Sequence, residues 1–482
     1  MPVTAAYRPD PSFERLGPEF ADVVAPAAFP HARTRYRNQR AAATVGLAGL
    51  SEAEWQDYFA RFEPLPGNQA KPLAMRYHGH QFRVYNPDLG DGRGFLFAQM
   101  REAQTDRLLD LGTKGSGRTP WSRGGDGRLT LKGGVREVLA TAMLEALGVP
   151  TSRSFSLVET GEALQRTDEP SPTRAAVLTR LSHSHIRFGT FQRHAALERG
   201  DLVRRLVDHV IEFYYPDLAG ADDPAAALLS AVASRAATLT AHWMTAGFVH
   251  GVLNTDNMNI TGESFDYGPY RFLPRNDPNF VAAYFDAQGL YSFGRQPEAV
   301  FWNLRQLAGA LSVVTDAEPL VAALNGFSAA YRASLALAMV RRLGLTPRGE
   351  PADVDLANAA FRALAEAGEN VRWEPFFFDW FCGVASEARA LAGPRAMNYQ
   401  GEACRAFRTA LAAYEPERPD RLASPFFAAP EPEELIYEEI EALWAEIAEK
   451  DDWTAFDAKL SAIERARAAW GLAADQSVSP LA

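Results

Sequence analysis

The chain has 482 residues, of which 47% are hydrophobic and 23% are charged, with a formal net charge of -11. This composition is typical of a folded globular protein, and the length favours two or three packed units over a single core. An acidic chain lacks the basic surface that nucleic-acid binding needs, so we expect no nucleic-acid partner. Two cysteines are too few for a framework of disulfide bonds or a multi-cysteine metal cluster.

The sequence shows no sign of export or membrane insertion. Residues 1–20 carry prolines and acids where a signal peptide has an apolar run. No apolar stretch approaches the roughly 20 residues needed to cross a bilayer. Together with an alanine- and arginine-rich composition, this leads us to expect a cytoplasmic bacterial protein with no membrane partner. The oligomeric state is open, and a monomer is favoured.

Taken in chain order, the predicted elements fall into four segments. Residues 1–75 mix short helical patterns with proline-punctuated loops, which indicates an N-terminal extension wrapped on a larger body. Residues 76–187 contain mostly strand-like runs, and residues 188–345 contain mostly helices, including a long alanine-rich helix from about Ala225 to Phe248. Residues 346–482 form a C-terminal helical extension. The order predicts an α+β, bilobal fold, for which a nucleotide cleft between the lobes is one natural use.

The strand-rich segment contains a single helix. Val135, Leu139 and Met143 recur at a spacing of four residues, and Gly148 and Pro150 follow the end of the pattern. Short apolar runs typical of strands cover residues 95–100, 108–112, 154–159 and 175–181. This is the element content of the smaller lobe of a protein kinase.

Two stretches of this segment are suited to a small polyanion. Gly90, Gly92 and Gly94 lie within five residues, so backbone N–H groups can approach phosphate closely, although a simple hairpin turn explains the same pattern. From Lys114 to Arg136, six cations stand against the single anion Asp126. A solvated basic surface is the alternative interpretation of this cationic stretch.

A lysine and a glutamate are placed like the ion pair that orients phosphates in kinases. Lys114 follows a predicted strand, and Glu137 lies early on the helix of the same lobe. Taken separately, each has a simpler explanation: a lysine in a surface turn, and an acid favoured near a helix N-terminus. Together, and downstream of a glycine-rich loop, they indicate a nucleotide site.

The segment from His250 to Asn257 has the spacing of a kinase catalytic loop. Asn257 stands seven residues after His250, where kinases bind metal, and Asp266 begins an Asp-Tyr-Gly sequence where kinases have Asp-Phe-Gly. Two such oxygen ligands, with triphosphate oxygens, suit Mg²⁺ or Mn²⁺. The catalytic aspartate of kinases is replaced by Val252. Asp256 is the only carboxylate of this loop that could act as a base, with a turn-capping aspartate as the alternative.

These segments together resemble the selenoprotein O (YdiU) family, whose members are pseudokinase-like enzymes that transfer AMP, not phosphate, to protein hydroxyls. The resemblance covers roughly residues 76–311. The segments that carry it are Tyr77 to Phe82, Gly90 to Gly94, Lys114 to Gly117, Arg123 to Arg128, Val135 to Glu137, His250 to Asn257 and Asp266 to Gly268. It implies a protein-kinase-like fold, Mg²⁺ or Mn²⁺, ATP as co-substrate with UTP as an alternative, and protein substrates.

The resemblance also implies roles for individual residues. Those expected to contact the nucleotide are Gly90, Gly92, Arg93, Lys114, Asp126, Gly127, Arg180, Arg187 and Asp266. Asn257 and Asp266 would hold the metal, and Asp256 would accept the proton. In this family ATP is bound in the reverse of its orientation in kinases, so that AMP is transferred and pyrophosphate leaves. The additional arginines make physical sense in that case, because a buried leaving group needs neutralisation.

Three functions are therefore compared. The favoured one is a protein adenylyltransferase that modifies Ser, Thr or Tyr hydroxyls. The second is a phosphotransferase of kinase type that uses Asp256 in place of the missing loop aspartate. The third, an inactive nucleotide-binding scaffold, is disfavoured because both metal ligands and the lysine–glutamate pair are present. The histidine pairs, His78 with His80 and His183 with His185, are interpreted as structural or as lying near phosphate, and not as metal ligands.

Overall fold

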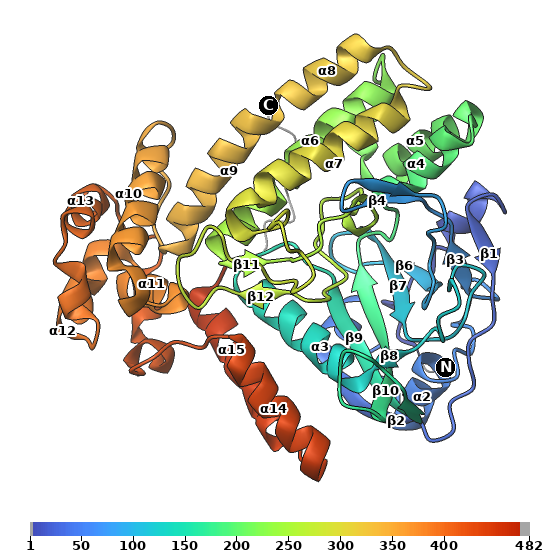
Figure 1. Ribbon diagram of the computed structural model, residues 1–482, viewed down its shortest axis with the longest axis horizontal. Helices are drawn as coiled ribbons and strands as arrows, with labels where there is room; N and C mark the ends of the chain where they lie inside the picture. Colours follow the sequence, from blue (N-terminus) through green and yellow to red (C-terminus); the bar gives the residue numbers. More distant parts are fainter. Residues whose placement is uncertain (1–2, 473–482) are drawn as a thin grey trace.

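The apolar runs of the N-terminal part pair into one antiparallel sheet, as a computed structural model that describes residues 3–472 shows (Figure 1). The predicted runs become its four central strands, since each is apolar enough to be buried. In spatial order the strands are β1 (Ala21–Val23), β3 (Leu73–Met75), β6 (Leu96–Arg101), β7 (Leu108–Lys114), β10 (Thr173–Ser182), β9 (Arg153–Leu164) and β2 (Arg33–Arg37), and β8 (Leu129–Thr130) pairs with β10.

The first 75 residues supply both edges of this sheet. β1 pairs with β3 at one edge, and β2 pairs with β9 at the other. Two short helices follow β2, α1 (Gln39–Thr44) and α2 (Glu52–Phe59). Trp55 of α2 is fully buried and stacks on Phe155 of β9 with ring centroids 5.2 Å apart. The segment is thus built into the sheet, while the domain boundary at residue 75 remains a prediction.

The single helix predicted for this lobe is α3 (Leu131–Ala146), which packs against β9 and β10. Thr130 caps it by accepting a hydrogen bond from the N–H of Gly133. Near the cleft a small hairpin, β4 (Gly79–Gln81) and β5 (Val84–Asn86), lies against the loop that contains Asp256. The lobe therefore has the sheet-plus-one-helix form of a kinase N-terminal lobe.

The larger lobe is helical and is organised around the alanine-rich helix α6 (Pro224–Thr245), as the sequence predicted. Small side chains let neighbouring helices approach α6 closely. These neighbours are α5 (Gly200–Tyr214), α7 (Gln296–Leu311), α8 (Ala317–Asn325) and α9 (Phe327–Arg342), and α4 (Phe188–Ala196) packs on α5 and α7. After α6 the chain forms β11 (Phe248–Val249), which pairs with β12 (Arg271–Phe272). These two strands bracket the predicted catalytic loop and metal segment. The bilobal kinase-like fold is thereby confirmed.

The C-terminal part forms two groups of helices. The first lies at the far end of the large lobe and consists of α10 (Ala352–Ala367), α11 (Trp373–Trp380), α12 (Glu387–Ala392) and α13 (Glu402–Leu411). The second, α14 (Tyr437–Lys450) and α15 (Thr454–Trp470), returns to the small lobe, where α15 packs on α3 (Figure 1).

One expectation about apolar stretches was wrong. The stretch Ala317–Arg342 is long and apolar enough, by length and composition, to cross a membrane, with a mean hydropathy of 1.2. It comprises α8 and α9, which both pack along α6. This stretch was overlooked in the sequence because it is rich in alanine, which is only moderately hydrophobic, and ends in two arginines.

A buried histidine predicts how stability changes with pH. His194 is 1% exposed, and neither ring nitrogen has a hydrogen-bond partner among the described residues. Burial lowers its pKa to about 4, helped by the nearby Arg193. The unfolded chain therefore takes up this proton first as the pH falls, and stability is lost from about pH 6.5 down to about pH 4. We expect His194→Leu to lose less thermal stability than the wild type between pH 7 and pH 5, as measured by circular dichroism. An unchanged pH dependence would contradict this.

Candidate nucleotide and metal site

A cavity of about 610 Å³ lies where the sheet meets the large lobe. It is lined by all of the predicted nucleotide, metal and base residues, which are Gly90, Gly92, Arg93, Lys114, Asp126, Gly127, Arg180, Arg187, Asp256, Asn257 and Asp266. Glu137 is the one predicted residue outside this lining, because it lies behind Lys114. The structure thus brings the whole set together, while the role of each residue remains a prediction.

The predicted lysine–glutamate pair is formed. Lys114 is the last residue of β7, and its Nζ lies 2.7 Å from Oε2 of Glu137 on α3 and 2.7 Å from Oδ1 of Asp266. Glu137 is fully buried, and its other carboxylate oxygen lies 3.2 Å from Nη1 of Arg180. Because an unpaired buried charge is strongly destabilising, these groups fix each other's positions.

Asp266 is surrounded by cations from three places in the chain. Besides Lys114, Nη1 of Arg180 lies 3.3 Å from Oδ1 of Asp266, and Nη1 of Arg187 lies 3.9 Å from Oδ2. Burial by itself would raise the pKa of Asp266, but Lys114, Arg180 and Arg187 outweigh it and hold that pKa well below the usual range. The residue also has a φ of +63°, an uncommon conformation that aims its carboxylate into the cavity. Asp266 is therefore an ionised carboxylate, which is suited to act as an oxygen ligand.

Arg187 links the two walls of the cavity. Its Nη1 donates to the backbone carbonyl of Asp256 at 2.7 Å, and its Nη2 lies 3.4 Å from Oδ1 of Asp91. Asp91 was not predicted as a site residue, although an acid between two glycines of a supposed phosphate loop was a signal for it. Its other oxygen accepts a hydrogen bond from the N–H of Met75, so it anchors the loop and Arg187 together.

Asp256 has the environment of a base. It is 9% exposed, it lines the cavity, and its Oδ1 has no hydrogen-bond partner among the described residues. Burial raises its pKa to about 6, against the opposing effect of Arg187. Its loop is held by the β4–β5 hairpin, in which the N–H of His80 donates to Oγ1 of Thr255 at 2.7 Å. A carboxylate with a raised pKa and a free oxygen is suited to accept a proton.

Two side-chain oxygens fit a hard divalent cation. The amide nitrogen of Asn257 donates to the carbonyl of Val252 at 3.0 Å, so its amide oxygen is the atom left for a ligand. Together with Asp266 it gives two protein donors, and Mg²⁺ or Mn²⁺ commonly takes its remaining ligands from phosphate and water. Across residues 3–472 no group of three or more His, Cys, Asp or Glu side chains could hold a metal. Any metal here would therefore be held jointly by protein and nucleotide.

The glycines of the loop have a structural reason of their own. A Cβ on Gly90 would lie 2.3 Å from Cγ of Trp121, and one on Gly92 would lie 2.8 Å from its carbonyl oxygen. The loop therefore needs glycine so that the segment around Trp121 can close over it. Phosphate contact by these residues remains a prediction.

The cationic stretch divides between the cavity and other partners. Lys114, Arg123 and Arg128 line the cavity. Lys132 instead forms an ion pair with Glu441, at 2.7 Å, and Arg136 donates to the carbonyl of Tyr270 at 3.2 Å. The interpretation as a polyanion site therefore applies to only part of the stretch.

Another cation at the cavity was missed. Arg166 comes from the turn between β9 and β10, and it pairs with Asp126 at 2.8 Å. Nothing in the local sequence indicates this pairing, because it depends on the fold of the turn.

The fold and this cavity define the class of protein: a bilobal, kinase-like fold with a charged cavity, in which Val252 replaces the loop aspartate of kinases. A family model described as protein adenylyltransferase SelO matches residues 3–464. A protein of Gloeobacter violaceus is 45% identical over 456 residues, with 93% of each chain covered. One of Synechococcus elongatus is 52% identical over 337 residues, covering 70% of this chain and 68% of its own. Both are named protein nucleotidyltransferase YdiU. The chain belongs to the SelO family.

The metal assignment predicts a specific loss in one variant. Asp266→Asn keeps the size of the side chain but removes the charge that a divalent cation needs. We expect the Mg²⁺-dependent part of ATP affinity to fall at least about 100-fold, as measured by isothermal titration calorimetry with and without Mg²⁺. Asp201→Asn, an exposed residue of α5 that pairs with Arg199 outside the cavity, is the matched control. Unchanged Mg²⁺ dependence in Asp266→Asn would rule out the assignment.

Proposed function

We propose that this protein is a cytoplasmic protein adenylyltransferase. It transfers AMP from metal-bound ATP to Ser, Thr or Tyr hydroxyls of other proteins and releases pyrophosphate, with UTP as an alternative donor. The observation that carries the proposal is the distribution of charge along the cavity. Membership in the SelO family and the names of the relatives support the same activity.

The inner end of the cavity suits phosphates and not a base. Lys114, Arg180 and Arg187 are each only 4% exposed, so three cations are concentrated there. Buried guanidinium and ammonium groups provide charge-assisted hydrogen bonds to phosphate oxygens. The Nε atoms of both arginines also lack partners among the described residues. Both arginines line the cavity that an anionic ligand would enter.

A histidine closes the space where a base could stack. Gly112 lies on β7 two residues before Lys114, so both face the same side of the sheet. The ring of His185 covers Gly112 so closely that a Cβ there would lie 2.2 Å from its Nε2. His185 is itself buried, and its N–H donates to Oδ2 of Asp110 at 2.8 Å. ATP therefore enters with its triphosphate inward and its base outward.

This orientation determines which bond breaks. With β- and γ-phosphates inside, the α-phosphorus faces the substrate hydroxyl. The hydroxyl oxygen attacks the α-phosphorus, its proton passes to Asp256, and the bond from the α-phosphorus to the bridging oxygen breaks. Pyrophosphate leaves among Lys114, Arg180 and Arg187, which stabilise its charge. A metal held by Asn257 and Asp266 would neutralise phosphate charge.

The kinase-type alternative uses the same residues with a different orientation. Asp256 would then deprotonate a hydroxyl that attacks the γ-phosphorus, and the base of ATP would have to occupy the inner end. The buried cations and the ring of His185 make that arrangement unfavourable.

Isotope transfer tests the proposed function. The protein is incubated with Mg²⁺ or Mn²⁺ and with ATP labelled at either the α- or the γ-phosphate, together with a mixed soluble bacterial protein fraction. We expect label on protein from α-labelled ATP only. Asp256→Asn should reduce this transfer by about 10²- to 10⁴-fold while it still binds ATP. Label from γ-labelled ATP alone would establish the kinase-type alternative, and no label from either would establish the scaffold.

The position of His185 predicts a second effect. His185→Gly opens the space over Gly112, which lets the base enter and misplaces the α-phosphate. We expect AMP transfer to fall by about 100-fold, with adenosine becoming a competitive inhibitor. His185→Phe keeps a ring in place and should retain transfer. Melting temperatures and Mg²⁺–ATP binding control for folding. Wild-type transfer in His185→Gly would refute the role of the ring.

A further inference from the structure

Helix α3 carries the glutamate on which Lys114 depends. Glu137 lies in the second turn of α3, and it pairs with both Lys114 and Arg180. A shift of α3 relative to the sheet would separate these charges, since Lys114 and Arg180 belong to β7 and β10. Whatever fixes α3 therefore acts on the nucleotide site without touching the nucleotide.

The C-terminal helices are attached to the sheet independently of α3. Asp451, directly after α14, accepts hydrogen bonds from Arg35 of β2 at 2.8 Å and from Arg174 of β10 at 2.7 Å. Arg174 also donates to the carbonyl of Ile447 on α14, at 3.0 Å. The turn between α14 and α15 is thus fixed to the same sheet that carries Lys114.

From this attachment the two helices reach both ends of α3. At its first turn, Nζ of Lys132 lies 2.7 Å from Oε2 of Glu441 on α14. Both side chains are largely shielded, at 20% and 33% exposure. Lys132 belongs to the cationic stretch that was interpreted as a polyanion site, but in the structure its partner is Glu441.

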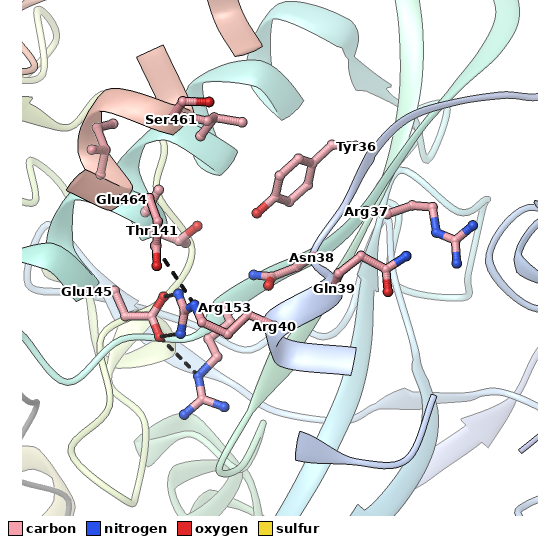
Figure 2. A pocket seen from close by; sticks show the side chains of 13 residues that line it. Tyr36, Arg37, Asn38, Gln39, Arg40, Thr141, Glu145, Arg153, Ser461 and Glu464 are labelled. Carbon is pink, nitrogen blue, oxygen red and sulfur yellow. Dashed lines mark hydrogen bonds and ion pairs between the residues drawn. The ribbon is translucent and has the colours of Figure 1, made fainter. Parts of the chain in front are cut away.

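At the other end of α3, ionic contacts add to the apolar packing of α15. Nη1 of Arg40 donates to Oε1 of Glu145 at 2.9 Å, while Nε of Arg40 lies 3.9 Å from Oε2 of Glu464 on α15. Arg153 also reaches Glu145, at 3.4 Å (Figure 2). A cavity of about 480 Å³ opens beside this contact, lined by Tyr36 and Thr141 among others. The ionic contacts therefore help to position α3 against α15 alongside the apolar packing.

We propose that α14 and α15 form a brace that positions α3, and through Glu137 sets the affinity of the nucleotide site. Lys132, Glu441, Arg40 and Glu464 are its positioning residues. The brace deepens the proposed function by naming what regulates that site. Any ligand or modification that altered these ionic contacts would change nucleotide affinity from outside the cavity.

Charge reversal in the full-length chain tests the brace. Lys132→Glu and Glu441→Lys each place like charges at the first turn of α3, and the double variant restores an opposite pair. We expect each single variant to bind Mg²⁺–ATP roughly 3- to 10-fold more weakly, and the double variant to return within about 2-fold of the wild type. Binding is measured by calorimetry, with melting temperatures recorded alongside. Glu446→Lys, on α14 but paired with Lys450, is the matched control and should bind normally.

The opposite end of α3 provides a second measurement. Arg40→Glu repels both Glu145 on α3 and Glu464 on α15 and should weaken Mg²⁺–ATP binding in the same range. Normal affinity in the single variants, or a double variant that does not recover, would overturn the brace even if melting temperatures changed. Because the readout is ATP binding, it separates the brace from the proposed function. Failure of AMP transfer in the wild type would remove the adenylyltransferase activity and leave this test intact.

Discussion

The two lobes are joined by the ion pairs that the carboxylate of Asp266 forms with three cations. Asp266 lies on the large lobe and is held by Lys114 of β7, Arg180 of β10 and Arg187 at the start of α4. This mutual pairing offsets the cost of burying charges, which is high for an unpaired ion. Under the proposed function, the carboxylate would pair with a metal and the cations with phosphates once ATP binds. Charge would then be balanced both before and after binding.

Prediction of the fold succeeded where the signal was local. Helices α3 and α6 and the four central strands were predicted because apolar periodicity along a short window reports burial directly. The edge strand β2 was missed because its sequence, Arg33 to Arg37, lacks apolar alternation. It is a strand through pairing with β9 and through Arg35, whose partner Asp451 lies 416 residues away. Non-local pairing of this kind leaves no trace in a sequence window.

The candidate site was likewise predicted where the signal was local and missed where it depended on distant residues. The spacing of Lys114, Asn257 and Asp266 was recognisable because motifs record geometry that a fold repeats. The count of cations between Lys114 and Arg136 could not show which of them line the cavity. Lys114 does, whereas Lys132 forms an ion pair with Glu441 on α14. His185 had been interpreted as a structural histidine, which its bond to Asp110 supports. Its contact with Gly112 could not be anticipated, since only the fold places the loop after β10 over β7.

The packing of the C-terminal helices on α3 has a consequence for folding during synthesis on the ribosome. Lys132 and Glu441 are separated by 309 residues. At a synthesis rate of about 5–20 residues per second, the ribosome needs roughly 15–60 s between them. During this interval the small lobe has its strands and its lysine but not its last supporting helices. A chain released early would carry the complete set of motifs from Gly90 to Asp266 without the C-terminal helices packed on α3. If α14 and α15 position α3 as proposed, the nucleotide site would be complete only after these helices have been synthesised.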